Sequence, residues 1–368
     1  MLPANVLAIR GSCMIVPAEE CREFLVQCAQ HQIGGYERVY VPVQNGEDHP
    51  EPGGLTPVSK TETWSLEGHR PIDPAKLLFY RPREQVLPGE FSPPKTILAG
   101  VKACDLRGIQ VLDTALLDQD FTDPGYQQWR NTVTIISVDC TTTAPTCHCT
   151  LVDGQPYARS GFDLNLSLIG DKYVVAIGSN RGEELANLFR KHLSVEESTS
   201  VHHSQVEVHR TRMTEQVEGL NASYAPRTGY DGLLRYALEN WKEESEECVG
   251  CGGCTNICPT CHCMILNDES ENDTFRKVRG YDSCQLEGYA RVAGGGTPRP
   301  QMTQRFRHRY LCKFLYMPEN FNQLGCTGCG RCIDVCPGGI EFRKVTTKLA
   351  SRPDTDESEP TSRTEEVF

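Results

Sequence analysis

Residues 248–263 read CVGCGGCTNICPTCHC, and this stretch decides how the rest of the chain is interpreted. Its first eleven residues and the proline that follows have the spacing C-x2-C-x2-C-x3-C-P, with the cysteines at Cys248, Cys251, Cys254 and Cys258. This run wraps a [4Fe–4S] cubane in bacterial ferredoxins. A second copy occupies Cys326, Cys329, Cys332 and Cys336. The two runs together predict two iron–sulfur clusters.

The ligands of each cluster are expected to come from both runs. In two-cluster ferredoxins the fourth cysteine of each run binds the other cluster. This rule assigns to cluster 1 the residues Cys248, Cys251, Cys254 and Cys336. It assigns to cluster 2 the residues Cys326, Cys329, Cys332 and Cys258. A zinc ribbon would show separate C-x2-C pairs, so the spacing disfavours it.

Length and composition restrict the class of protein. The 368 residues suggest two or three domains. The net charge of −12 and the lack of a basic stripe with aromatics make nucleic acid an unexpected partner. The apolar runs are far shorter than the ~20 residues of a membrane span, and the N-terminus does not resemble a signal peptide. The chain has 19 cysteines, which we interpret mainly as metal ligands. Because such thiolates need a reducing compartment, we expect the protein in the cytoplasm of an anaerobic or microaerobic cell.

Residues 1–195 are expected to form an α/β domain with a mainly parallel sheet. Helical periodicity follows Pro17, follows the apolar segment 96–101, and covers 182–192. Strands are predicted at 37–43, 76–80, 96–101, 132–138 and 173–177, with loops at 44–60 and 81–94. Alternating strands and helices favour parallel pairing.

Four cysteines in this domain predict a third cluster. Cys104 and Cys140 each follow a predicted strand, and ligands collect at the carboxyl ends of parallel strands. The helix N-terminus beside Cys104 would lower the pKa of its thiol. Cys147 and Cys149 complete the set, and residues 140–149 (CTTTAPTCHC) match residues 254–263 (CTNICPTCHC) at seven of ten positions. The alternatives are packing cysteines or a zinc site that includes His148.

The second half is expected to be a polar linker, a ferredoxin domain and a tail. Residues 196–228 are polar and predict a linker with solvated histidines. Residues 229–346 predict an all-helical two-cluster ferredoxin domain, beginning with an amphipathic helix at 232–247. Residues 347–368 predict a disordered acidic tail. The basic run Arg305, Arg307, His308, Arg309 and Lys313 either faces a partner, offsets cluster charge or forms a solvated helix face.

Four further cysteines have no place in these sites: Cys261, Cys263, Cys284 and Cys312. We expect them to pack near the cubanes, and a further cluster is the alternative.

Several segments, in this order, resemble one protein family. They are GVKACDLRGIQVLD (100–113), CTTTAPTCHC with GFDLNL (161–166), the stretch 248–263, YDSCQLEGYARVAGGG (281–296), RFRHRYLCKF (305–314) and GCTGCGRCIDVCPGGIEF (325–342). The resemblance, over about residues 75–345, is to the iron–sulfur protein shared by cytoplasmic sulfur-reducing hydrogenases, as their β subunit, and by anaerobic sulfite reductase. It implies a relay between a flavin- and NAD(P)H-binding partner and a catalytic partner of the hydrogenase, sulfite reductase or heterodisulfide reductase type.

The expected function is therefore that of a non-catalytic redox subunit in a larger oxidoreductase complex. We find no nucleotide-binding fingerprint, no Ser/His/Asp arrangement and no paired carboxylates, so no nucleotide cofactor is predicted in this chain. The competing hypothesis is an oxidoreductase subunit whose α/β domain holds a flavin or deazaflavin. A structural adaptor with zinc in the N-terminal loop is a third hypothesis.

Overall fold

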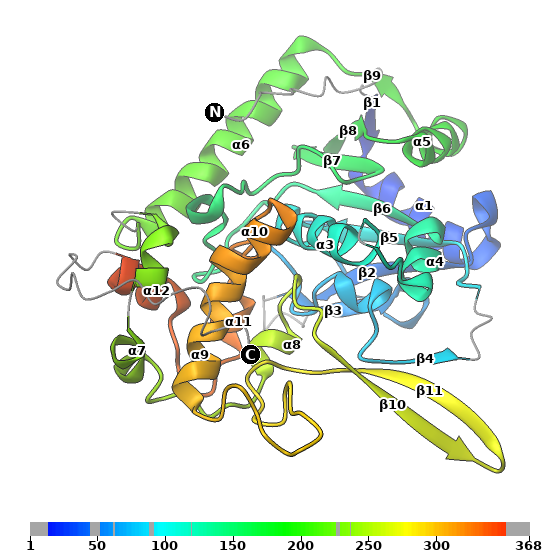
Figure 1. Ribbon diagram of the computed structural model, residues 1–368. Coiled ribbons are helices and arrows are strands. Elements are labelled where there is room, and N and C mark those ends of the chain that lie inside the picture. The colour runs from blue at the N-terminus through cyan, green and yellow to red at the C-terminus, as the bar shows by residue number, and fades with distance from the viewer. Residues whose placement is uncertain are drawn as a thin grey trace.

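The computed structural model describes residues 14–44, 52–61, 63–87, 92–118, 120–225, 229–235 and 237–350. An α/β part with a large sheet packs against a second, mostly helical part, and a long hairpin projects from the second part (Figure 1). Cys13 and most of the expected acidic tail lie outside the described residues. Helix α12 (Phe342–Ala350) includes residues 347–350, so the tail begins later than predicted.

The α/β part is built on an eight-stranded sheet with the order β3-β2-β5-β6-β7-β8-β1-β9. Its central strands β2 (Arg38–Gln44), β5 (Thr96–Val101), β6 (Val133–Val138) and β7 (Leu164–Ile169) are parallel, as predicted. Antiparallel strands extend both edges: β3 (Pro52–Pro57), β8 (Lys172–Ile177), β1 (Met14–Pro17) and β9 (Glu196–Glu197). Every residue of β5 and β6 is buried, as expected for strands covered on both faces.

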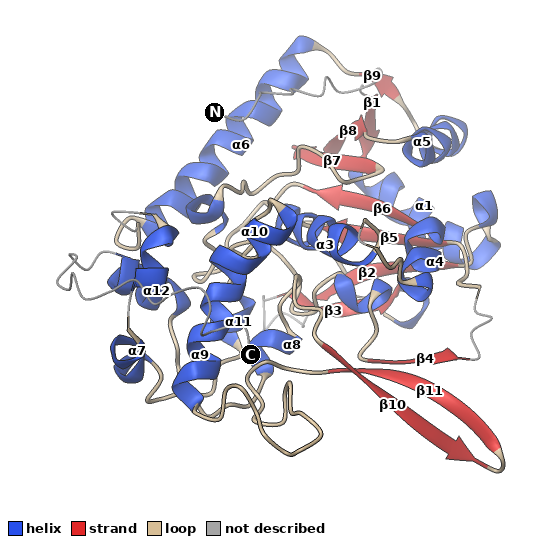
Figure 2. Ribbon diagram, in the orientation of Figure 1, coloured by secondary structure: helices blue, strands red, loops and turns tan. Residues whose placement is uncertain are grey.

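Helices cover both faces of this sheet (Figure 2). On one face α1 (Ala18–His31) and α5 (Asn180–His192) pack on Ile97 and Ile136. On the other face α2 (Lys76–Phe79), α3 (Ala103–Leu116) and α4 (Pro124–Thr132) pack on Leu98 and Ile135. The alternation of neighbouring residues between the two cores follows from the two-residue repeat of a strand. Burying one Val, Leu or Ile side chain contributes about 1.5–3 kcal/mol, so each face holds the layers together.

Some local predictions in this half are wrong. Residues 76–79, expected as a strand, form the short helix α2. The prediction failed because so short an apolar segment has no period that tells a strand from a helix. The expected loops at 44–60 and 81–94 contain β3 and β4 (Arg83–Leu87). Short 3-10 turns occur at Ile33–Gly35, Val58–Lys60 and Cys149–Val152. The helix expected after β5 is present and begins at Ala103, so Asp105 lies in its first turn.

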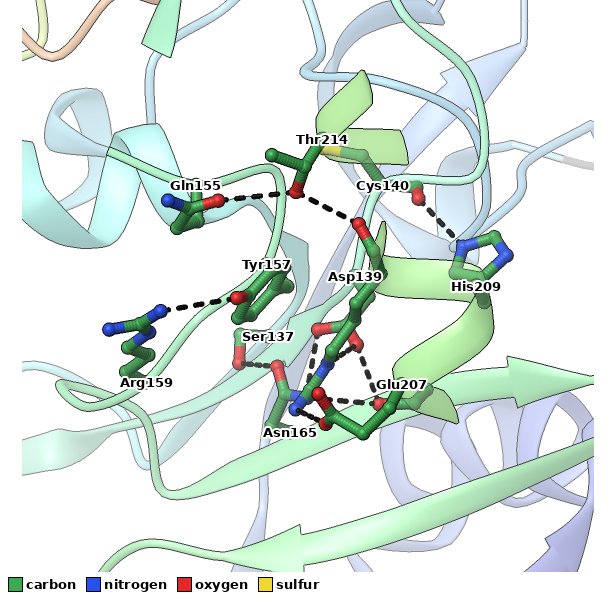
Figure 3. A network of polar contacts seen from close by, with 12 residues as sticks. Ser137, Asp139, Cys140, Gln155, Tyr157, Arg159, Asn165, Glu207, His209 and Thr214 are labelled. Atoms are coloured by element: carbon green, nitrogen blue, oxygen red, sulfur yellow. Dashed lines mark hydrogen bonds and ion pairs between the residues drawn. The ribbon is translucent and has the colours of Figure 1, made fainter. Parts of the chain in front are cut away.

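The segment expected to be a polar linker contains the 22-residue helix α6 (Ser200–Asn221). Its buried stripe consists of Val206, Met213, Val217 and Asn221. This stripe is too narrow to stand out among polar residues, which explains the wrong prediction. Val206 packs on Ile15 and Val174 of the sheet. Polar contacts hold the same helix, and Figure 3 shows His209 beside Cys140. His209 Nε2 lies 3.0 Å from the carbonyl oxygen of Cys140, and Arg210 Nε donates to Asp139 Oδ2 (2.8 Å).

The second part has an aromatic core formed by several short helices. The expected helix at 232–247 is divided into a 3-10 segment (Tyr230–Arg235) and α7 (Leu238–Glu244). Helices α9 (Met302–Leu311) and α10 (Met317–Phe321) are joined by a π-helical turn at Cys312–Tyr316. Tyr310 of α9 stacks on Phe342 of α12, with ring centroids 4.6 Å apart. Short helices α8 (Gly253–Asn256) and α11 (Arg331–Asp334) lie within the two cysteine runs.

This part is not all-helical, contrary to our prediction. Between the cysteine runs, β10 (Met264–Glu271) and β11 (Thr274–Tyr281) form an antiparallel hairpin, and β4 pairs with β11. The turn residues Asn272 and Asp273 both have positive φ, which these residue types tolerate well. The hairpin is visible as the long yellow arm in Figure 1. Within the described ranges, no helix combines the length and apolar character needed to cross a membrane.

Candidate iron–sulfur centres

The two cysteine runs have the same backbone design. Gly250 and Gly252 of the first run have φ of 65° and 74°, and Gly328 and Gly330 of the second have φ of 69° and 77°. Each pair is followed by a one-turn helix, α8 or α11. Only glycine adopts this left-handed conformation without strain. The backbone N–H groups of Gly250 and Gly328 donate to the sulfur atoms of Cys248 and Cys326 and lower the pKa of each thiol against the effect of burial.

One cavity contains the residues predicted to hold cluster 2. Its cysteines are Cys258, Cys326, Cys329 and Cys332. Cys258 of the first run therefore lies beside three cysteines of the second run. Arg309, Lys313 and His148 line the same cavity. Burial raises the pKa of Cys326 to about 12, so this thiol needs nearby positive charge or a metal to ionise.

Unpaired donors at this cavity fit an iron–sulfur cluster. Arg309 Nε and Thr327 Oγ1 are buried, and neither has a hydrogen-bond partner among the described residues. Both residues line the cavity. Buried polar groups are almost always satisfied, so such donors point to an acceptor that belongs there. The sulfur atoms of a cluster accept hydrogen bonds of this kind, and these bonds tune its potential.

The residues predicted for cluster 1 lie at the surface end of the second part. Burial raises the pKa of Cys248, and the neighbouring Cys336 and Cys251 raise it further, which places the three side chains together. Burial also raises the pKa of Cys254, and Cys248 and Cys251 are among the neighbours that raise it further. Cys251 itself is exposed. Cys336 of the second run thus lies beside Cys248 of the first.

A second cavity contains the four cysteines predicted for the third site: Cys104, Cys140, Cys147 and Cys149. Cys104 is in the first turn of α3, directly after β5, and Cys140 follows the adjacent parallel strand β6. The 3-10 turn at Cys149–Val152 ends the loop. The carboxyl ends of the two parallel strands therefore meet at this cavity, as expected.

The prediction that Cys104 has a lowered pKa is wrong for the chain without bound metal. Burial, followed by the charge of Asp105, raises this pKa well above its usual value. Burial also raises the pKa of Cys140 to about 12, opposed by the ammonium group of Lys102. Desolvation therefore outweighs the helix N-terminus. A bound metal would supply the charge that deprotonates these thiols.

The two cavities share two residues, Gly328 and Cys329. The second run packs directly on the loop of the third site, where the N–H of His148 donates to the carbonyl oxygen of Gly328 (2.8 Å). His148 Nε2 lies 3.7 Å from Cys326 Sγ. His148 therefore faces the cluster 2 cavity and not the third site. It does not line the cavity that its neighbours Cys147 and Cys149 line.

Buried arginines connect the second run to the α/β part. Arg331 forms a bidentate ion pair with Asp105, with distances of 2.8 and 2.7 Å, and donates from Nε to the carbonyl oxygen of Pro71 (2.9 Å). Arg70 donates from Nε to the carbonyl oxygen of Cys329 (2.7 Å) and pairs with Asp334. The sequence did not single out Arg70 or Arg331. The one hint in the sequence was the position of Arg331 inside the second cysteine run, between Gly330 and Cys332.

The basic residues Arg305, Arg309 and Lys313 on α9 and the π-helical turn are buried and do not form a solvated helix face. Arg309 and Lys313 are buried beside the cysteines, which agrees with an offset of cluster charge. Arg305 is also buried, and it donates to the carbonyl oxygens of Gln285, Arg299 and Pro300. Across the described residues, no three His, Cys, Asp or Glu side chains converge as ligands of one metal ion.

Comparison with known proteins agrees with this arrangement. A family model described as a 4Fe-4S dicluster domain matches residues 247–340. The chain is similar to the sulfhydrogenase 2 subunit beta of Pyrococcus furiosus, with 33% identity over 327 residues, 85% of this chain and 92% of that protein. It is also similar to the F420-dependent formate dehydrogenase subunit beta of Methanocaldococcus jannaschii, with 26% identity over 133 residues, 34% of this chain and 27% of that protein.

The match to the Pyrococcus furiosus protein extends over most of both chains, and the dicluster match covers both cysteine runs. The two cysteine runs, their shared backbone design and the cavities that they line are consistent with both matches. The chain therefore belongs to the family of iron–sulfur β subunits of hydrogenases.

Proposed function

We propose that this chain is an electron-transfer subunit that holds three [4Fe–4S] clusters and relays single electrons between two partner subunits. One partner binds a flavin and NAD(P)H, and the other carries a catalytic centre of the hydrogenase, sulfite reductase or heterodisulfide reductase type. Bound clusters supply one-electron redox chemistry. The chain's own residues bind them, bury them and donate hydrogen bonds to them. A cytoplasmic complex is the proposed setting.

The observation that carries the proposal is the arrangement of the predicted ligands. Two cavities are each lined by one predicted set of four cysteines, and Cys329 borders both. Cys254 lies beside Cys258, so the cluster 1 group continues this series. The series runs from the carboxyl edge of the sheet to the exposed Cys251. Contiguous sites ending at the surface suit a relay between partners.

The third site is tested by replacing one ligand in the native complex. We expect Cys140→Ser to lose about four irons per chain, one cubane, and one electron paramagnetic resonance signal, with the other signals retained. Cys21→Ser is the matched control, because Cys21 is fully buried in α1, outside both cavities. An unchanged iron content and spectrum for Cys140→Ser would reject the third site. Loss of one zinc ion instead of iron would identify a zinc centre.

The role of the chain is tested by its cofactors and partners. We expect the purified chain to release no flavin on denaturation and to show only the broad absorbance of clusters. Released flavin or deazaflavin would overturn the pure relay and favour a cofactor-binding α/β domain. Purification of the native complex should yield two further proteins, one that contains flavin and one that carries the catalytic centre, identified by mass spectrometry.

A further inference from the structure

Four cysteines outside the sites described above lie around the base of the hairpin. Cys261 and Cys263 directly precede β10, and Cys284 follows β11. The N–H of Asp282 donates to the carbonyl oxygen of Cys263 (3.0 Å), so the two ends of the hairpin lie side by side. Cys312 begins the π-helical turn after α9. Turns of this type are frequent at functional sites.

The thiols of three of these residues, Cys263, Cys284 and Cys312, are close neighbours. Burial raises the pKa of Cys284 to about 12, and Cys263 and Cys312 raise it further. Burial also raises the pKa of Cys312, and Cys263 is again among its neighbours. The hydroxyl of Tyr289 is hydrogen-bonded to Cys263. Three segments far apart in sequence therefore bring thiols to one buried place.

The loop that carries two of these cysteines repeats the loop of the third site. In the loop of the third site the N–H of Cys147 donates to the carbonyl oxygen of Ala144 (3.0 Å). In the loop before β10 the N–H of Cys261 donates to the carbonyl oxygen of Cys258 (3.4 Å). The contact between His148 Nδ1 and the carbonyl oxygen of Thr146 (2.9 Å) also recurs.

In the second loop the equivalent contact joins His262 Nδ1 to the carbonyl oxygen of Thr260 (3.0 Å). In the first loop the cysteines on either side of the histidine line a four-cysteine cavity. Cys261 and Cys263 occupy the equivalent positions of the second loop.

Two buried lysines indicate negative charge at this place. Lys76 Nζ donates to the carbonyl oxygen of Cys261 (3.0 Å), and Lys313 Nζ donates to Thr260 Oγ1 (2.6 Å). Cysteines are the acidic groups nearest to both ammonium groups: Cys258 and Cys261 for each, with Cys312 beside Lys313. Neither lysine forms an ion pair with a carboxylate in the described part of the chain. A buried charge needs compensation, and thiolates bound to a metal cluster supply it.

We propose that Cys261, Cys263, Cys284 and Cys312 hold a further [4Fe–4S] cluster at the base of the hairpin. Four thiolates with no oxygen ligand suit iron–sulfur chemistry. The sulfur atoms of Cys261 and Cys258 lie next to each other, which places the new site directly beside cluster 2. This inference rests on the proposed relay function, and it gives the relay a branch toward the hairpin.

The test uses iron and sulfide analysis with electron paramagnetic resonance on the native complex. We expect about sixteen irons per chain in the wild type, four cubanes, where three cubanes would give about twelve. Cys284→Ser and Cys312→Ser should each lose about four irons and the same single signal. The double variant Cys284→Ser/Cys312→Ser should lose no more than either single variant, because both ligands serve one cluster. Cys28→Ser, a buried cysteine of α1, is the control and should lose none.

Combination with the third site separates the possible failures. Cys284→Ser/Cys140→Ser should lose about eight irons, since the two residues serve different clusters. Full iron content in Cys284→Ser, with the expected loss in Cys140→Ser, would overturn the new site and leave the relay intact. Retention of iron in both variants would overturn the third site as well. Should the variants not fold, a wild-type content of about twelve irons would still refute the new site.

Discussion

The two cysteine runs share a backbone but differ in their surroundings. In the first run Cys251 is exposed, and Val249 is 67% exposed. In the second run the equivalent residues, Cys329 and Thr327, are buried. Arg70 and the loop at 146–149 cover the second run. Identical ligand spacing thus serves one site open to the surface and one enclosed between two parts of the molecule.

This difference indicates what each run contributes to electron transfer. A cluster near an exposed cysteine can exchange electrons with another protein, while an enclosed cluster can pass them only within the chain. Burial and donors to sulfur also tune potential. The runs are therefore expected to respond differently to equivalent substitutions.

The largest contrast is expected at the residue that follows the second glycine. Arg331 and its partner Asp105 are each 1% exposed, so Arg331→Ala leaves an unpaired buried carboxylate and should cost about 3–5 kcal/mol in the free energy of unfolding. The equivalent residue of the first run is Gly253. A Cβ there would meet its nearest atom, Cys251 Sγ, at 3.6 Å, an ordinary contact.

Gly253→Ala should therefore change stability by less than about 1 kcal/mol. Anaerobic denaturant unfolding followed by circular dichroism measures both. Equal midpoints for the two variants would show that the ion pair does not secure the second run.

A smaller contrast is expected at the left-handed glycines. Alanine at any of these positions costs about 1–2 kcal/mol for its positive φ. Gly328→Ala adds a clash, because its Cβ would lie 2.4 Å from the Cα of Cys149. Gly250→Ala meets only the flexible end of Met302, at 2.5 Å. We expect Gly328→Ala to lose more stability and more iron, measured by thermal unfolding and iron analysis, and the reverse order would contradict the packing of the second run on the third site.

The smallest contrast concerns the residue between the first cysteine and the first glycine. Thr327→Val removes a buried hydroxyl that lines the cluster 2 cavity. A lost hydrogen bond of about 0.5–1.5 kcal/mol corresponds to about 20–60 mV for one electron. The potential of one cluster should become more negative by that amount, because hydrogen bonds to sulfur favour the more negative reduced state.

Val249→Thr is the matched control, and it should leave every potential unchanged because residue 249 is exposed. Redox titration followed by electron paramagnetic resonance measures both variants. A shift of the same size in Val249→Thr would mean that the exposed and enclosed positions do not differ.

The sequence predicted the elements with strong local patterns. The buried strands β5 and β6 were found because each is a short, largely apolar run, and helix α1 was found because its apolar residues follow a helical period. The cysteine groupings were predicted by spacing and by the repeat of PTCHC. Helix α6 and the hairpin were missed because their stability comes from contacts with distant segments, such as Arg210 with Asp139, and not from a broad apolar face.

The electrostatics of the sites could not be read from the sequence. The ion pair of Arg331 joins residues 226 positions apart, and no local pattern announces it. The pKa of Cys104 depends on burial, which only the fold determines. The inward orientation of Arg309 and Lys313 depends on how α9 packs on the aromatic core.

The proposed exchange of fourth cysteines between the runs has a consequence for biogenesis. With Cys258 and Cys336 crossing over, neither ligand set is complete until the ribosome has made the chain beyond Cys336. By then the α/β part, with Asp105 and the carbonyl oxygen of Pro71 ready to receive Arg331, has long been synthesised. Assembly factors that deliver clusters would therefore meet a chain whose first domain already has the surface on which the second run settles. On this proposal neither cluster can be completed before the second run has been made.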